Sequence, residues 1–273
     1  MPNVELNGTS IYYESYGEGL PVVFIHDYRT SHRLFEPQIE YFRHRLQVIV
    51  WDLRGNGLSG KMNVGIDSIL DAQCEDLKSL LDCLGVGKAI LVACSSGGVL
   101  ARKFASKYLE RTRALVLIDS SASAKAGSRK SERWISALQV CAQSMHYLPA
   151  ELFLRPLRIT YGRWLPAYAI LRREVLNKRT TEAIKQSLAV EYFKPSDGTE
   201  TLRLPTLLVG GAQDQWTLRK IRRAASECPS AHLEILEDAI YPSHLCQPHR
   251  FNRLLLDFLN DHHLLYEPDP NTV

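Results

Sequence analysis

The residues with the clearest chemical potential lie around Ser95, which follows an apolar run and precedes two glycines. The sequence Ala93-Cys94-Ser95-Ser96-Gly97 is a variant of the G-x-S-x-G turn, in which a strand ends, the chain turns sharply and a helix begins. Small residues are needed on both sides because the serine backbone is strained and the strand and helix pass close together. A hydroxyl at this tip faces the free N–H groups at the start of the helix, which stabilise negative charge. The segment therefore predicts that Ser95 is a nucleophile.

Short apolar runs alternate with helical patterns along most of the chain. Most of these runs are continuous, which is typical of strands that are covered on both faces. The runs that we expect to be strands are Ile11–Tyr16, Val22–Ile25, Val48–Val50, Ala89–Val92, Leu115–Ile118, Thr206–Val209 and Leu233–Leu236. One helix is predicted from Asp67 to Leu84, with Gly85 as its stop signal, and another begins at Pro248. This alternation predicts an α/β fold with a mainly parallel sheet and helices on both faces.

The stretch between residues 122 and 201 interrupts this alternation. It shows no strand pattern and is helical, aromatic and basic, so we expect residues 122–201 to form a helical cap. Residues 1–121 and 202–265 then form the core of the fold. Residues 266–273 are polar and contain two prolines, and we expect them to be a disordered tail.

The composition argues against several classes of protein. A formal net charge of +3 over 273 residues is too small for a dedicated nucleic-acid binder. No apolar run approaches the ~18 residues of a membrane span, and the first residues contain no apolar signal segment. The six cysteines lack C-x-x-C spacing, and the sequence contains neither a P-loop nor an H-E-x-x-H motif. We therefore expect a cytoplasmic protein with reduced thiols that uses no metal and no cofactor and binds neither nucleic acid nor membranes. A homodimer is compatible with the sequence.

Six motifs, in the right order, resemble those of the α/β-hydrolase superfamily, specifically its small members with a helical cap. The motifs are IYYESYGEG (residues 11–19), VVFIHD (22–27), WDLRGNGLS (51–59), the turn at Ser95, GAQD (211–214) and the Gln247-Pro248 start of the last helix. The resemblance covers nearly the whole chain. It implies an α/β-hydrolase fold with a mainly parallel, eight-stranded sheet and a helical cap insertion. The order Ser, Asp, His along the chain is the order that this fold requires.

The resemblance also implies roles for the residues around Ser95. By position, the backbone N–H groups of Tyr28 and Ser96 belong to the oxyanion hole. The residues placed next to the substrate are His26, Asp27 and Cys94. Asp27 replaces the usual glycine, and a carboxylate beside a developing oxyanion is repulsive unless it points away or is protonated. The HD and CSSG sequences are also similar, over a short length, to small fungal lactonases that open macrocyclic lactones.

Two aspartates are candidates for the acid that orients the base. Asp214 matches the usual site of the family and would hold an imidazole in the correct tautomer. Asp119 ends the strand before the predicted cap, where some family members place their acid. We favour Asp214 and keep Asp119 as the alternative.

The position of the general base departs from the family pattern. Counted back from Gln247-Pro248, the histidine of the family falls on Tyr241, and the nearest histidine is His244. A tyrosine with a pKa of ~10 is about 0.1% ionised at pH 7 and is a poor base. Three extended residues span up to ~10 Å, whereas a base must approach within ~3 Å, so His244 can serve only if the loop takes a different path. His244 is therefore a candidate base, with a structural histidine as the alternative.

Three functions are compatible with these residues. The first is a serine hydrolase that cleaves a small, apolar ester or lactone through an acyl-enzyme, with Ser95 as nucleophile, Asp214 as acid and His244 as base. The second is a ligand-binding protein that has lost hydrolysis. The third is a lyase or cyclase in which Tyr241 donates a proton or a hydrogen bond. We favour the hydrolase.

Overall fold

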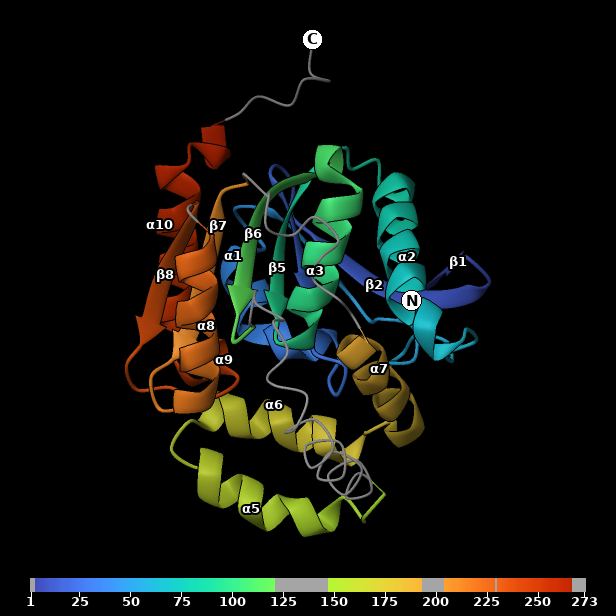
Figure 1. The fold of residues 1–273 in the computed structure, drawn as a ribbon, viewed down its shortest axis with the longest axis vertical. Coiled ribbons are helices and arrows are strands. Elements are labelled where there is room, and N and C mark those ends of the chain that lie inside the picture. The colour runs from blue at the N-terminus through green and yellow to red at the C-terminus, as the bar shows by residue number, and fades with distance from the viewer. Residues whose placement is uncertain (1–2, 121–146, 193–203, 229, 267–273) are drawn as a thin grey trace.

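The computed structural model describes residues 3–120, 147–192, 204–228 and 230–266 (Figure 1). Within these residues, eight strands form one sheet in the order β1-β2-β4-β3-β5-β6-β7-β8. The strands are β1 (Asn3–Leu6), β2 (Thr9–Tyr16), β3 (Pro21–Ile25), β4 (Gln47–Trp51), β5 (Ala89–Cys94), β6 (Thr112–Ile118), β7 (Thr206–Gly211) and β8 (Ala231–Leu236). The pairs β1–β2 and β2–β4 are antiparallel and the other pairs are parallel. This confirms the predicted mainly parallel, eight-stranded sheet.

Helices cover both faces of the sheet, as predicted. One face carries α1 (Glu36–Phe42), α9 (Ser243–Cys246) and α10 (Pro248–Asp261), and the other carries α2 (Ile69–Cys83), α3 (Ser96–Lys107) and α8 (Gln215–Glu227) (Figure 1). Successive strand residues point to opposite faces, so Phe24 joins the first core and Ile25 the second. Both faces are buried, which explains why the strands are continuous apolar runs. Within the described ranges, every helix is too short or too polar to span a bilayer.

A group of three helices lies between β6 and β7 and forms the described part of the cap. These helices are α5 (Glu151–Tyr161), α6 (Leu165–Leu176) and α7 (Thr180–Tyr192). They lie beyond the carboxyl ends of the parallel strands (Figure 1). This edge of an open α/β sheet is where ligands bind in such folds. The cap is helical where it is described, but its predicted limits at residues 122 and 201 fall outside the described residues and stay a prediction.

Two elements differ from the sequence-based expectation. The edge strand β1 was not predicted, because its four residues alternate between exposed and half-buried and pair only with β2. The helix predicted from Asp67 begins instead with a short 3-10 turn at Ile66–Ser68, and α2 follows it. Gly85 ends that segment with a φ of 67°, as a glycine stop signal requires. Of the predicted tail, residues 267–273 lie outside the described residues.

A buried ion pair joins the loop after β4 to α2. The guanidinium of Arg54 donates to both carboxylate oxygens of Asp76, at 2.6 Å from Nε and 2.5 Å from Nη2. Both side chains are almost fully buried, at 1% and 0% exposure. Two parallel hydrogen bonds satisfy the planar guanidinium and hold the WDLRGNGLS turn on the core.

We expect Asp76→Ala to lower the free energy of unfolding by about 3–5 kcal/mol, because it leaves the Arg54 charge buried without its partner. Urea unfolding followed by circular dichroism measures this loss. Glu40→Ala is the matched control, because Glu40 pairs with Arg43 at an exposed site and its loss should cost less than about 1 kcal/mol. Equal losses in the two variants would contradict this assignment.

Candidate functional site

Ser95 lies at the tip of the turn between β5 and α3. Its backbone has a φ of 52° and a ψ of −116°, a conformation that L-residues rarely adopt. Its N–H donates to the carbonyl of Ile118 at 2.8 Å, which fixes the turn against β6. A Cβ at Gly97 would stand 2.6 Å from the carbonyl oxygens of Ile25 and His26, so only glycine fits there. The described residues provide no hydrogen-bond partner for the Ser95 hydroxyl.

The predicted oxyanion hole is occupied by a neighbouring side chain. The N–H of Tyr28 donates to the hydroxyl oxygen of Ser96 at 3.0 Å, and that hydroxyl donates to Oδ2 of Asp27 at 3.4 Å. Asp27 is fully buried, and its Oδ1 accepts from the backbone N–H of Arg29 at 2.8 Å and from its Nε at 3.3 Å. The N–H that should receive an oxyanion is therefore already bonded, and a buried carboxylate lies two hydrogen bonds away.

Tyr241 lies near this group of residues, at the position expected for the base. Burial and the nearby charge of Asp27 raise the pKa of its phenol well above its ordinary value, so the phenol stays protonated. The guanidinium carbon of Arg29 lies 5.7 Å from the centre of the Tyr241 ring. The hydroxyl of Tyr161, the last residue of α5, donates to the Tyr241 carbonyl. Such a phenol can donate a hydrogen bond but cannot accept the proton of Ser95.

His244 lies on α9, inside the core between the sheet and α10. Its ring stacks on Phe35 with the ring centres 5.0 Å apart, and it meets the edge of Phe251 at 5.7 Å. Nε2 donates to the carbonyl of Leu34 at 3.2 Å, and Nδ1 has no partner among the described residues. Burial lowers its pKa to about 4. No hydrogen bond joins His244 to Ser95 in the part of the chain that the structure describes, so we leave it out of the site that we propose.

The two candidate acids hold backbone groups rather than an imidazole. Asp214 caps α8, where its carboxylate accepts from the N–H of Thr217 at 3.0 Å and from its hydroxyl at 2.6 Å. Asp119 follows β6 and accepts from the N–H groups of Gly211 at 3.2 Å and Ser243 at 2.6 Å. Burial raises the pKa of Asp119 to about 7, even though those hydrogen bonds oppose the shift. Both carboxylates therefore fix loops at the carboxyl edge of the sheet.

The other residues predicted near the substrate are packed away. His26 donates from Nδ1 to the carbonyl of Asp27 at 2.7 Å, and its Nε2 accepts from the N–H of Leu53 at 3.0 Å. Burial lowers the pKa of His26, so it is a neutral structural imidazole. Cys94 is also fully buried, and burial raises the pKa of its thiol well above the ordinary value. Among the described residues, no group of three or more His, Cys, Asp or Glu side chains could hold a metal ion.

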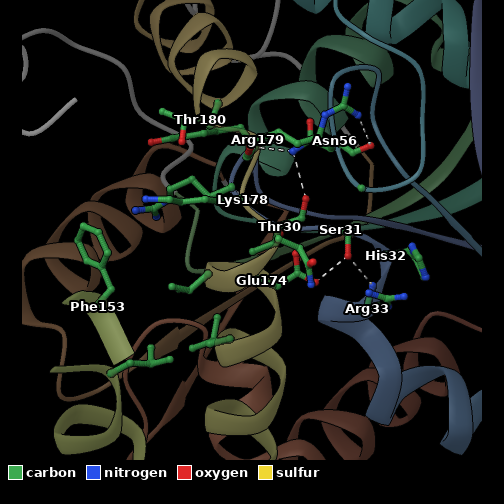
Figure 2. Close-up of a pocket in the computed structure, with 18 of the residues that line it drawn as sticks. Thr30, Ser31, His32, Arg33, Asn56, Phe153, Glu174, Lys178, Arg179 and Thr180 are labelled. Atoms are coloured by element: carbon green, nitrogen blue, oxygen red, sulfur yellow. Dashed lines mark hydrogen bonds between the residues drawn. The ribbon is translucent and has the colours of Figure 1, made fainter. Parts of the chain in front are cut away.

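A cavity of about 630 Å³ lies between the cap and the loop after β3. Of the predicted site residues, Tyr28 and Tyr241 line it, whereas Ser95, His26, Asp27 and Cys94 do not. The loop contributes residues 28–33, and the cap helices contribute the opposite wall. Lining residues that the sequence analysis missed include Ser31, Arg33, Glu174, Lys178 and Arg179 (Figure 2). The basic composition of the cap is the only sequence signal for Lys178 and Arg179, and Ser31, Arg33 and Glu174 belong to no recognisable motif.

We expect the stability of the protein to depend on pH through His244. Its folded pKa of about 4 lies below its ordinary value of 6.5, so the neutral ring contributes stability above pH 6.5 that is lost as the pH falls toward 4. In His244→Leu this loss is absent, and wild type should lose up to about 1.4 kcal/mol per pH unit relative to the variant. Urea unfolding of both proteins between pH 7 and pH 4.5 measures the difference. Parallel pH profiles would show that the ring can be protonated in the folded state.

Residues 21–239 match the family described as the α/β hydrolase fold. RutD of Azorhizobium caulinodans, which is assigned as a carbamate hydrolase, is 27% identical over 269 residues, covering 96% of this chain and 99% of the relative. The 3-oxoadipate enol-lactonase 2 of Acinetobacter baylyi is 26% identical over 244 residues, covering 85% of each chain. Among solved structures, Est816, an N-acyl homoserine lactone degrading enzyme, superposes with a TM-score of 0.77 at 26% identity, covering 94% of this chain and 100% of Est816. The motifs, the sheet, the turn at Ser95 and the match over most of the chain agree: this protein belongs to the α/β-hydrolase fold family.

Proposed function

We propose that this protein binds a small ester, lactone or carbamate in the cavity under its cap, and that it does not catalyse the hydrolysis performed by relatives with a complete Ser–His–Asp triad. The observation that carries the proposal is the side chain at the base position, which is the phenol of Tyr241 rather than an imidazole. The class of ligand is taken from the relatives, which include enzymes that act on lactones and a protein assigned as a carbamate hydrolase.

The chemistry of Tyr241 supports this proposal. Acyl transfer by a serine needs a base that removes the hydroxyl proton and returns it to the leaving group. A phenol with a pKa raised well above its ordinary value is protonated at neutral pH and accepts no proton from serine. Loss of one triad member can reduce the rate as much as loss of all three.

The hydrogen bond that the predicted oxyanion hole already forms also supports the proposal that hydrolysis is absent. The Tyr28 N–H is already bonded to Ser96, so an oxyanion must displace that hydroxyl. Asp27 lies behind Ser96, and its carboxylate repels negative charge that develops near Ser95. Removal of one oxyanion donor typically costs about 3 kcal/mol of transition-state stabilisation. Both features weaken stabilisation of a tetrahedral intermediate without closing the cavity.

The cavity fits a small ligand. Its volume of about 630 Å³ lies within the range of roughly 300–1,000 Å³ that is usual for small-molecule sites. Tyr28 and Tyr241 connect the cavity to the residues around Ser95, so a bound carbonyl compound lies next to the altered site. A protein of this kind binds its ligand and releases it unchanged.

Hydrolysis at Ser95 is the second candidate function, and the backbone at Ser95 favours it. A non-glycine residue with a φ of 52° and a ψ of −116° costs on the order of 1–3 kcal/mol, and such strain is commonly kept at catalytic positions. In this version Ser95 attacks the carbonyl carbon, Asp214 or Asp119 is the acid, and a base must come within ~3 Å of the hydroxyl.

The substitution Tyr241→His separates the two candidates. We expect wild type to leave p-nitrophenyl butyrate almost unhydrolysed, and Tyr241→His to raise the rate by about 100-fold or more, because a positioned general base contributes roughly 10²–10⁴. Release of p-nitrophenol measures the rate. Tyr241→Phe is the matched control, because it removes the phenol hydroxyl without supplying a base, and it should leave the rate unchanged.

Ser95→Ala completes the experiment. In the Tyr241→His background it should abolish the gained activity, because the new imidazole then has no nucleophile to serve. Rapid hydrolysis by wild type that Ser95→Ala abolishes would overturn the binding proposal and establish the second candidate. A product without added water, seen by mass spectrometry, would also overturn it and would indicate a lyase or cyclase.

A further inference from the structure

We propose that the ligand of this cavity carries a free carboxylate together with an apolar chain, so that the protein distinguishes acidic esters or lactones from neutral ones. This inference rests on the proposed function because it concerns the same cavity. It specifies the chemical class of the ligand more narrowly than the proposed function does, and the side chains that line the cavity support it.

The charges of the cavity wall are unequal. Four cationic side chains line the cavity, namely Arg29, Arg33, Lys178 and Arg179, and a single acidic side chain, Glu174, lies among them. Arg29 is neutralised by Asp27 behind the wall, at 3.3 Å. The other two arginines of the wall, Arg33 and Arg179, are the groups that we expect to bind a carboxylate.

Two of these arginines, Arg33 and Arg179, form no ion pair with a carboxylate within the described residues. Nη1 of Arg179 donates to the carbonyl oxygens of Ser59 at 2.7 Å and Asn56 at 3.3 Å, which are neutral acceptors. Within the described residues, no carboxylate lies within ion-pairing distance of Arg179 or Arg33. A guanidinium in a partly closed site is a favourable partner for a carboxylate, which it binds through paired N–H donors.

Glu174 interacts electrostatically with Arg33 but forms no ion pair with Arg33 or Arg179 within the described residues. Its side chain is 9% exposed, and one carboxyl oxygen accepts from the Ser31 hydroxyl at 2.7 Å (Figure 2). Burial raises the pKa of Glu174, although the hydrogen bond from Ser31 opposes the shift. Glu174 is the single acidic side chain among the lining residues, so it can offset at most one of the cationic groups around the cavity.

The rest of the wall is apolar and comes from the cap. Phe153 and Leu157 of α5 and Leu171 and Val175 of α6 line the cavity. An apolar chain that lies against these side chains gains about 25 cal/mol for each Å² removed from water. The cationic groups and the apolar helices together fit a molecule with a charged end and an apolar body.

Monomethyl adipate and dimethyl adipate test this inference, because they differ only in one carboxylate. We expect isothermal titration at pH 7.5 and low salt to give at least about 10-fold tighter binding of the monomethyl ester, since a charge-assisted hydrogen bond adds roughly that factor. Arg33→Gln and Arg179→Gln should each lower the affinity for the monomethyl ester by about 10-fold and leave the affinity for the dimethyl ester unchanged. Arg172→Gln is the matched control, because Arg172 is exposed on α6 and does not line the cavity.

Each outcome has a separate meaning. Equal binding of the two esters, or equal weakening of both by the arginine substitutions, would overturn this inference and leave the proposed function standing. Binding of neither ester would contradict the proposed function itself. Because Arg179 also holds the loop at Asn56, Arg33→Gln is the decisive variant if Arg179→Gln fails to fold. Unchanged binding of the dimethyl ester shows that the cavity is intact in the variants.

Discussion

The close approach of α3 to the end of β3 is the constraint on which this molecule depends. Gly97 passes the carbonyls of Ile25 and His26 at a distance that excludes any side chain, and this contact fixes where β5 ends and α3 begins. The strained backbone of Ser95 follows from it, because the chain has to reverse within one residue. The loop after β3 begins at the same contact, so the turn positions the residues around Ser95 and also one wall of the cavity.

Several polar groups next to this turn form hydrogen bonds with one another. Ser96 bonds to Tyr28 and Asp27, Asp27 bonds to Arg29, and the ring of Tyr241 lies close to Arg29. Buried polar groups are costly when they lack partners, and this network removes that cost. A hydrolase keeps such donors free for its transition state. The framework of the family is therefore retained here, while the Tyr28 N–H beside Ser95 is bonded to Ser96 and the Ser95 hydroxyl itself has no partner among the described residues.

The sequence predicted the framework far better than the site. Continuous apolar runs and the glycine-rich turns revealed the sheet, the two-sided helices and the turn at Ser95, because each is set by local sequence. The strand β1 escaped because a short edge strand has no apolar run. The sequence identified His244 as the nearest histidine but did not predict where its ring lies, since its orientation depends on packing against Phe35 and Phe251. Cap residues such as Glu174 reach the cavity only through tertiary contacts with Ser31, which no sequence pattern encodes.

The hydrogen bond from Tyr161 to the Tyr241 carbonyl links two parts of the chain that lie far apart in sequence. Tyr161 ends α5, so a displacement of that helix acts directly on the segment that contains Tyr241. Binding of a ligand beneath the cap helices is thus coupled to the orientation of the Tyr241 ring. In a Tyr241→His variant, the reactivity of Ser95 would therefore depend on the position of the cap helices as well as on the side chains present.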